Sequence, residues 1–122
     1  MSANLIGFGC DLQQKLDKMP PRDRKARWAG DVGVELYRIA RKLHRVSEEA
    51  RDYGTTPAAE RREKRLVEQA QEAVNQLGKG IKVFRQPDPA GWPLYIVFPR
   101  DVPPRSEMGA YFEKGIAVPP GP

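Results

Sequence analysis

The sequence predicts a single α+β domain: an antiparallel αα-hairpin and an N-terminal helix packed against a two-stranded antiparallel β-hairpin, with a short C-terminal helix and a disordered proline-rich tail. Apolar residues recur at helical spacing up to about residue 78, whereas the remainder contains nine of the twelve prolines and six of the ten aromatic residues. A chain of 122 residues is long enough for one domain with its own core. We divide it into an N-terminal helix (1–19), a helical hairpin (20–78), a β-hairpin (79–99) and a turn-rich C-terminal segment (100–122).

The composition excludes several classes of protein. A single cysteine excludes a disulfide scaffold, and with a single histidine it leaves too few ligands for a structural zinc site. No apolar run approaches the roughly 20 residues of a membrane span, and the first residues lack the basic leader and long apolar stretch of a secretory signal. We therefore expect a cytoplasmic domain without metal or cofactor, mildly basic at a formal net charge of +5.

The first predicted helix runs from about Asn4 to Lys18. Its apolar residues follow one another at spacings of three and four and form a stripe: Leu5, Phe8, Leu12 and Leu16. Cys10 falls within this stretch, so we interpret it as an inert core thiol. Pro20 and Pro21 end the helix, because proline cannot continue its hydrogen bonds.

The second predicted helix, from about Arg22 to Tyr53, has the clearest pattern. Its apolar residues alternate at spacings of four and three and form a heptad seam: Val32, Leu36, Ile39, Leu43, Val46, Ala50 and Tyr53. Trp28 extends the seam by one turn. Gly54 follows, and a glycine in the left-handed conformation commonly closes a helix.

A third helix is predicted from Pro57 to Leu77. Thr56 can act as its N-cap, Pro57 suits the first helical position, and Gly78 can end it. One stripe of this helix carries Ala59, Leu66, Ala70, Ala73 and Leu77. Because only about three residues connect the second and third helices, the two must run antiparallel.

Two β-branched and aromatic runs, 81–85 and 92–98, predict a β-hairpin around a proline-rich loop. Pro93 has no amide hydrogen, so we expect it at the start or the outer edge of its strand.

Beyond the hairpin, the chain is expected to form a short helix and then a disordered tail. Ser106 and Glu107 can cap a helix that contains Tyr111 and Phe112. From Val118 onward, the sequence is rich in proline and is expected to be disordered.

Both faces of the second predicted strand are apolar. Trp92, Leu94, Ile96 and Phe98 share the heavier face, which we assign to the core, while Tyr95 and Val97 share the other. A two-stranded sheet is marginal alone, so the second face either is covered within the domain or meets a second copy or a partner protein. The residues predicted for such a partner interface are Trp92, Tyr95, Val97, Tyr111 and Phe112.

Cations gather on the second predicted helix, on the side opposite to its seam. Six of them fall within an arc of about 100° at helical periodicity: Arg24, Arg27, Arg38, Arg41, Lys42 and Arg45. The planar guanidinium group bonds two phosphate oxygens at once, so this stripe predicts binding to nucleic acid. The alternative is a solvated helix face whose arginines pair with acids of neighbouring helices.

Other candidates for chemistry carry less weight. The cluster Arg61, Arg62, Lys64 and Arg65 is diluted by glutamates, which is typical of a solvated helix. His44 is the sole histidine and lies on a flank of the second predicted helix, between seam and cation stripe, so we interpret it as a surface or boundary residue. The sequence therefore predicts no catalytic residues.

These patterns predict a small non-catalytic accessory or regulatory protein that contacts nucleic acid or a nucleoprotein through the arginine-rich helix face. The alternative is an inhibitor or adaptor of the bacterial or phage accessory type, which binds a protein through the aromatic β-hairpin and C-terminal segment. A third possibility, a toxin-like ribonuclease using Arg, Lys, Tyr and Glu, would need a larger and earlier sheet than the sequence predicts.

Overall fold

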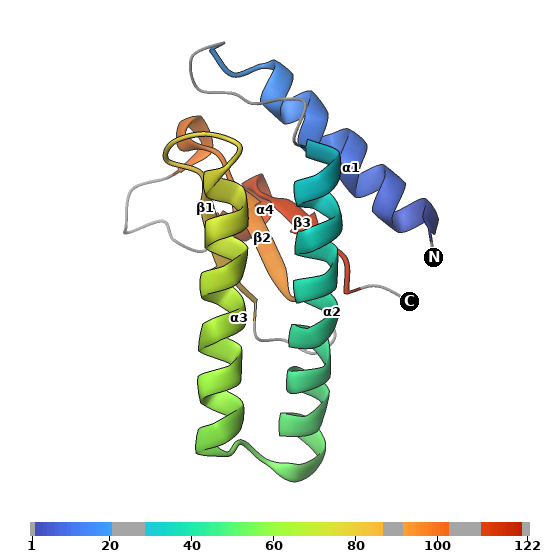
Figure 1. Ribbon diagram of the computed structural model, residues 1–122, viewed down its shortest axis with the longest axis vertical. Coiled ribbons are helices and arrows are strands. Elements are labelled where there is room, and N and C mark those ends of the chain that lie inside the picture. The colour runs from blue at the N-terminus through green and yellow to red at the C-terminus, as the bar shows by residue number, and fades with distance from the viewer. Residues whose placement is uncertain (1, 21–28, 87–91, 103–110, 121–122) are drawn as a thin grey trace.

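The computed structural model describes residues 2–20, 29–86, 92–102 and 111–120. Its elements in chain order are α1 (Ser2–Asp17), α2 (Ala29–Tyr53), α3 (Pro57–Asn75), β1 (Lys82–Arg85), β2 (Leu94–Val97), the 3-10 helix η3 (Pro99–Asp101), α4 (Tyr111–Lys114) and β3 (Ile116–Val118). The α+β class and the predicted helical hairpin are confirmed (Figure 1). Trp28 and the predicted start of the second helix near Arg22 lie outside the described residues.

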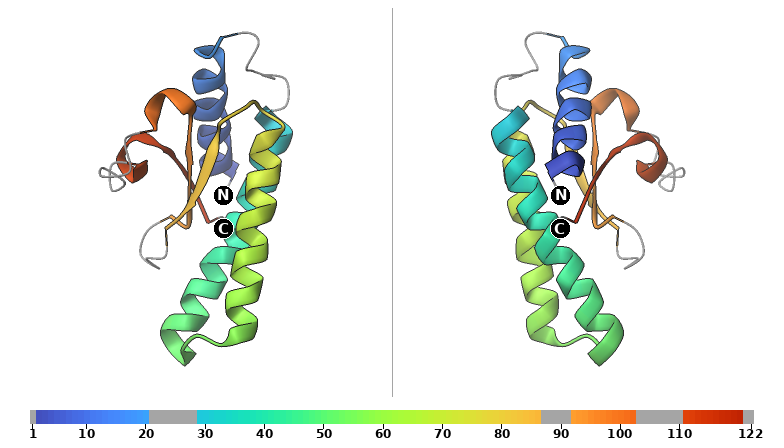
Figure 2. Two further views of the ribbon diagram at one scale, coloured as in Figure 1. Left: turned by 90° about the vertical axis from the view of Figure 1, so that its left-hand side faces the viewer. Right: turned by 90° about the vertical axis from the view of Figure 1, so that its right-hand side faces the viewer.

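The three strands form one antiparallel sheet in the order β1-β2-β3. Val83 pairs with Ile96, and Ile96 pairs in turn with Ile116. The helices α1, α2 and α3 lie on one side of this sheet, and α4 lies on the other side (Figure 2). The sheet is therefore the middle layer of the molecule.

The third strand corrects the prediction of a two-stranded sheet with a disordered tail. Val118 pairs with Leu94, and both Val118 and Pro119 are buried. The run Ile116–Val118 has only three residues between a glycine and two prolines, so the sequence alone gives no strand signal there. Its partner strand β2 stabilises it.

Local chemistry fixes the turn between α2 and α3 as predicted. Gly54 adopts a φ of 84°, and its N–H donates to the carbonyl oxygen of Ala50 at 2.9 Å. The hydroxyl of Thr56 accepts a hydrogen bond from the N–H of Ala59 at 3.1 Å, and Pro57 occupies the first helical position.

The far end of α3 differs from the prediction. The helix ends at Asn75, and Leu77 lies in the turn that follows. The N–H of Leu77 donates to the carbonyl oxygen of Val74 at 2.9 Å. The glycine with positive φ is Gly80, at 77°, and not Gly78. The chain therefore reverses two residues later than the sequence predicts.

The predicted apolar stripes meet in one core between the helices and the sheet. Its buried members include Phe8, Leu12 and Leu16 of α1, Leu36, Ile39 and Leu43 of α2, Leu66, Ala70 and Ala73 of α3, and Leu94, Ile96 and Phe98 from the second strand run. The small residues of α3 allow α2 to approach closely. Tyr53, placed at the end of the seam by its spacing, is instead 87% exposed, because the tip of the α2–α3 hairpin extends beyond the sheet (Figure 1).

Gln71 of α3 holds the edge strand β1 against the helices. Its side-chain amide donates to the carbonyl oxygen of Ile81 at 2.8 Å and accepts from the N–H of Val83 at 3.0 Å. One side chain thus bonds to the backbone on the open side of β1, where another strand could otherwise pair.

Arg85 links β1 to α2 and α3 through a side chain that is 13% exposed. Its Nε donates to the carboxylate of Glu63 at 2.9 Å. One terminal nitrogen donates to the backbone carbonyl oxygens of Gln86 and Pro93, the latter at 3.1 Å. The other donates to the carbonyl oxygen of Leu43 at 3.4 Å and to the hydroxyl of Ser47. A guanidinium group has five N–H donors. All five are used within the protein, so Arg85 is not available to an external ligand.

Candidate functional site

The strongest candidate site is the basic face of α2, formed by Arg38, Arg41, Lys42 and Arg45. All four side chains are exposed, whereas Leu36, Ile39 and Leu43 on the opposite side of the helix are buried. The heptad seam fixes this arrangement, because a helix that buries one face must turn the opposite face outward. Arg24 and Arg27, which the sequence adds to the same stripe, lie outside the described residues.

The cations of the basic face are unpaired, whereas several other cations of the described structure form ion pairs. Lys15 pairs with Asp101, Arg85 with Glu63 and Arg51 with Asp52. Within the described ranges, none of Arg38, Arg41, Lys42 and Arg45 forms an ion pair or a side-chain hydrogen bond. No acid of the described helices therefore comes within ion-pair distance of these four charges.

A shallow groove of about 370 Å³ adjoins the basic face between α2 and α3. Lys42 and Arg45 line it from α2, and Arg62 lines it from the facing side on α3. At one end Glu49 contacts Arg62 through a long ion pair of 3.9 Å between exposed side chains. Such a pair is weak, so Arg62 adds a fifth cation that an anionic ligand can recruit.

The sequence pattern places Arg62 in a solvated cluster and gives no sign of its place beside the basic face. The exposure predicted for that cluster is confirmed, since Arg61, Arg62, Lys64 and Arg65 are all exposed. The missing information was the register between α2 and α3, which decides which residue of one helix faces Arg45 on the other. A helical wheel of each helix taken separately cannot supply it.

The predicted aromatic interface is largely internal. Val97 is fully buried, so the prediction that it points outward is wrong. Tyr111 of α4 is buried as well, and its ring stacks on that of Phe84 with the centroids 4.2 Å apart. The helix α4 thus covers the sheet face that the sequence left open (Figure 2).

The remaining predicted interface residues are placed differently from one another. Tyr95 is half-buried, and Trp92 is 44% exposed at the entrance to β2, so the prediction that Trp92 belongs to the core face is wrong. The side chain of Phe112 is outside what the structure describes. Trp92 is thus the one member of the predicted set that the described structure places as exposed.

Groups suited to catalysis or metal binding are dispersed. The Nε2 of His44 contacts Glu48 one turn later at 3.0 Å, an arrangement of two surface side chains. Cys10 is exposed, which corrects the prediction of a core thiol: it lies two residues from both Phe8 and Leu12, about 200° around the helix from each. In the part of the chain that the structure describes, no three His, Cys, Asp or Glu residues gather as a metal site would require.

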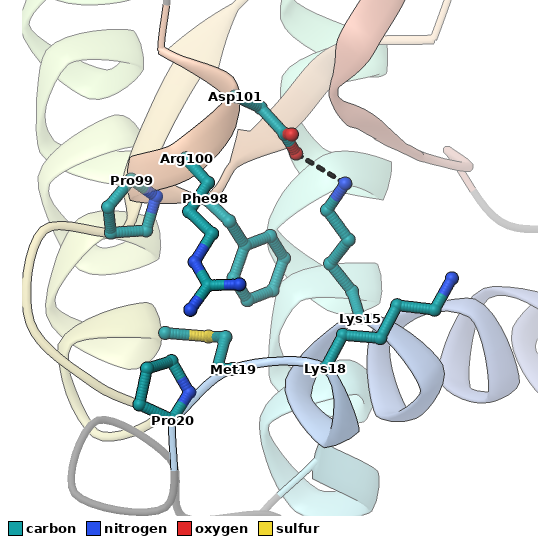
Figure 3. Close-up of a pocket in the computed structure, with 8 residues that line it drawn as sticks. All are labelled: Lys15, Lys18, Met19, Pro20, Phe98, Pro99, Arg100 and Asp101. Atoms are coloured by element: carbon teal, nitrogen blue, oxygen red, sulfur yellow. Dashed lines mark ion pairs between the residues drawn. The ribbon is translucent and has the colours of Figure 1, made fainter.

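A second concave feature lies where the end of α1 meets η3. This cavity of about 410 Å³ is lined by Lys15, Lys18, Met19, Pro20, Phe98, Pro99, Arg100 and Asp101 (Figure 3). Lys15 and Asp101 form an ion pair at its rim. The basic face is on α2, so the two features are separate sites.

Comparison with protein families, with curated proteins and with solved structures finds no match to this chain. Among the described helices, none combines the length and the apolar character that crossing a bilayer requires.

Proposed function

We propose that the protein is a non-catalytic binding protein that contacts the phosphate backbone of nucleic acid, alone or within a nucleoprotein, through its basic face. The observation that carries this proposal is the gathering of unpaired cations: Arg38, Arg41, Lys42 and Arg45 are exposed on one helix face, and none forms an ion pair with the described residues. Arginine suits this task because its fork bonds two phosphate oxygens at once.

Phosphate contacts should dominate the affinity of such a face. Each phosphate that a cation neutralises releases condensed counterions, and the logarithm of the binding constant falls with the logarithm of salt concentration by about 0.9 per contact on duplex DNA. Contacts from four cations therefore predict a slope of about −3 to −4. Base sequence should matter little, because phosphates carry no sequence information.

A titration of the full chain against labelled duplex DNA and duplex RNA tests the proposal. Binding followed by fluorescence anisotropy should weaken about 60-fold to 250-fold between roughly 50 and 200 mM salt, as this slope requires. Two duplexes of unrelated sequence should give the same affinity. Affinity that ignores salt, or the absence of binding to either duplex at low salt, contradicts the proposal.

A further inference from the structure

We infer that the cavity between α1 and η3 binds a small monocarboxylate with an apolar body, such as a short fatty acid. The site is independent of the basic face and of the function proposed for it. Its volume of about 410 Å³ lies near the lower end of the range of about 300–1,000 Å³ that small-molecule sites occupy, so the ligand is small.

The floor and walls of this cavity are apolar. Phe98 and Met19 are buried beneath it, and Pro20 and Pro99 flank it. A ligand that fills this space gains free energy by removing its own apolar surface from water. The same walls offer few hydrogen-bond partners to a heavily hydrated, multiply charged anion such as phosphate.

Arg100 supplies the charged group that selects the carboxylate. Its side chain is exposed and runs beside the Phe98 ring toward Met19 (Figure 3). Among the residues that the structure describes, Arg100 has no ion pair and no side-chain hydrogen bond. A free guanidinium group beside an apolar floor can bond both oxygens of one carboxylate while the ligand's hydrocarbon part packs below.

The other charges of the cavity do not oppose an anion. Asp101 is the one carboxylate in the lining, and Lys15 neutralises it through their ion pair. Lys18 extends from the rim away from the cavity and adds a further positive charge near the entrance (Figure 3). The cavity therefore has a net positive charge over an apolar interior, which favours an amphipathic anion over a neutral molecule of the same shape.

Methionine methyl groups provide a direct readout. The chain has three methionines, and Met19 lies in the cavity, so its methyl resonance in protein labelled with methyl-carbon-13 methionine reports occupancy. Met19→Leu assigns the signal. Octanoate should shift the Met19 resonance with saturation. The control 1-octanol, which has the same chain without the charge, should bind at least about tenfold more weakly. That difference corresponds to one well-placed charged hydrogen bond.

Matched variants test the role of Arg100. Arg100→Gln should reduce octanoate binding to the level of octanol, whereas Lys79→Gln, which removes an exposed charge outside the cavity, should leave both unchanged. The Met19 resonance itself remains a test in wild-type protein if a variant fails to fold. The inference is overturned if this resonance does not move, if all three methionine resonances move alike, if octanol binds as well as octanoate, or if Arg100→Gln retains the preference. Changing Arg38, Arg41 and Arg45 should not affect octanoate, so failure here and failure of the proposed function are distinguishable.

Discussion

At the scale of single residues, Arg85 holds three elements together because each of its five N–H donors meets an acceptor. The acceptors come from α2, α3 and the start of the second strand run. A sequence pattern places Arg85 in a strand but gives no sign of this role, since Glu63, Ser47 and Leu43 are all more than twenty residues away. Arg85 is therefore not one of the cations that an external ligand can bind.

Replacing Arg85 by lysine tests whether the five donors matter or only the charge. Lysine can keep the contact with Glu63, but it cannot reach the hydroxyl of Ser47 and three carbonyl oxygens at once. We expect Arg85→Lys to lower the free energy of unfolding by about 2 kcal/mol, since buried acceptors lose their donors. Lys82→Arg on the exposed side of the same strand should change it by less than about 0.5 kcal/mol. Equal effects of the two changes in urea unfolding would contradict the role given to Arg85.

At the scale of elements, features with a local cause were predictable. The N-cap Thr56, the helix-starting Pro57 and the left-handed Gly54 act on atoms within a few residues, so the chain near them contains the whole explanation. The strand β3 was not predictable, because it depends on pairing with β2 twenty-two positions earlier. The same holds for Arg62, whose place beside the basic face depends on how α3 is seated on α2.

The pairing of α2 with α3 makes a prediction about Leu43. This residue is fully buried at the centre of the predicted seam. Leu43→Ala should therefore cost about 2–5 kcal/mol of unfolding free energy, as emptying a buried leucine site does. Val34→Ala, on the exposed side of the same helix, should cost less than about 0.5 kcal/mol. A loss at Leu43 as small as that at Val34 would mean that the seam does not form the core.

At the scale of the whole molecule, the sheet has cover on both faces within one chain. The sequence predicts Tyr95 and Val97 as part of an interface with a partner. The structure instead buries Val97 and stacks Tyr111 on Phe84, because α4 lies on that side of the sheet. A four-residue helix is too short to show a periodic apolar stripe, which is why its covering role had no counterpart in the sequence pattern.

The basic face is the exposed feature on which the proposed function depends. Its exposure follows from the heptad seam and was predictable from the sequence of α2 alone. Its lack of acidic partners was not predictable, since the alternative of a solvated helix face, with arginines paired to acids of neighbouring helices, fits the same sequence. No acid of the described helices and strands forms an ion pair with Arg38, Arg41, Lys42 or Arg45.

The most direct measurement compares the affinity of two matched triple variants for one duplex at low salt. Arg38, Arg41 and Arg45 are changed to glutamine in the first, and Lys64, Lys79 and Lys82, which are exposed elsewhere, are changed to glutamine in the second. Both lose three positive charges, so any effect of net charge is the same. We expect the first variant to bind about tenfold more weakly or worse, with a salt slope smaller by about 2.7, while the second stays close to wild type. Equal losses of affinity in the two folded variants would contradict a site on the basic face.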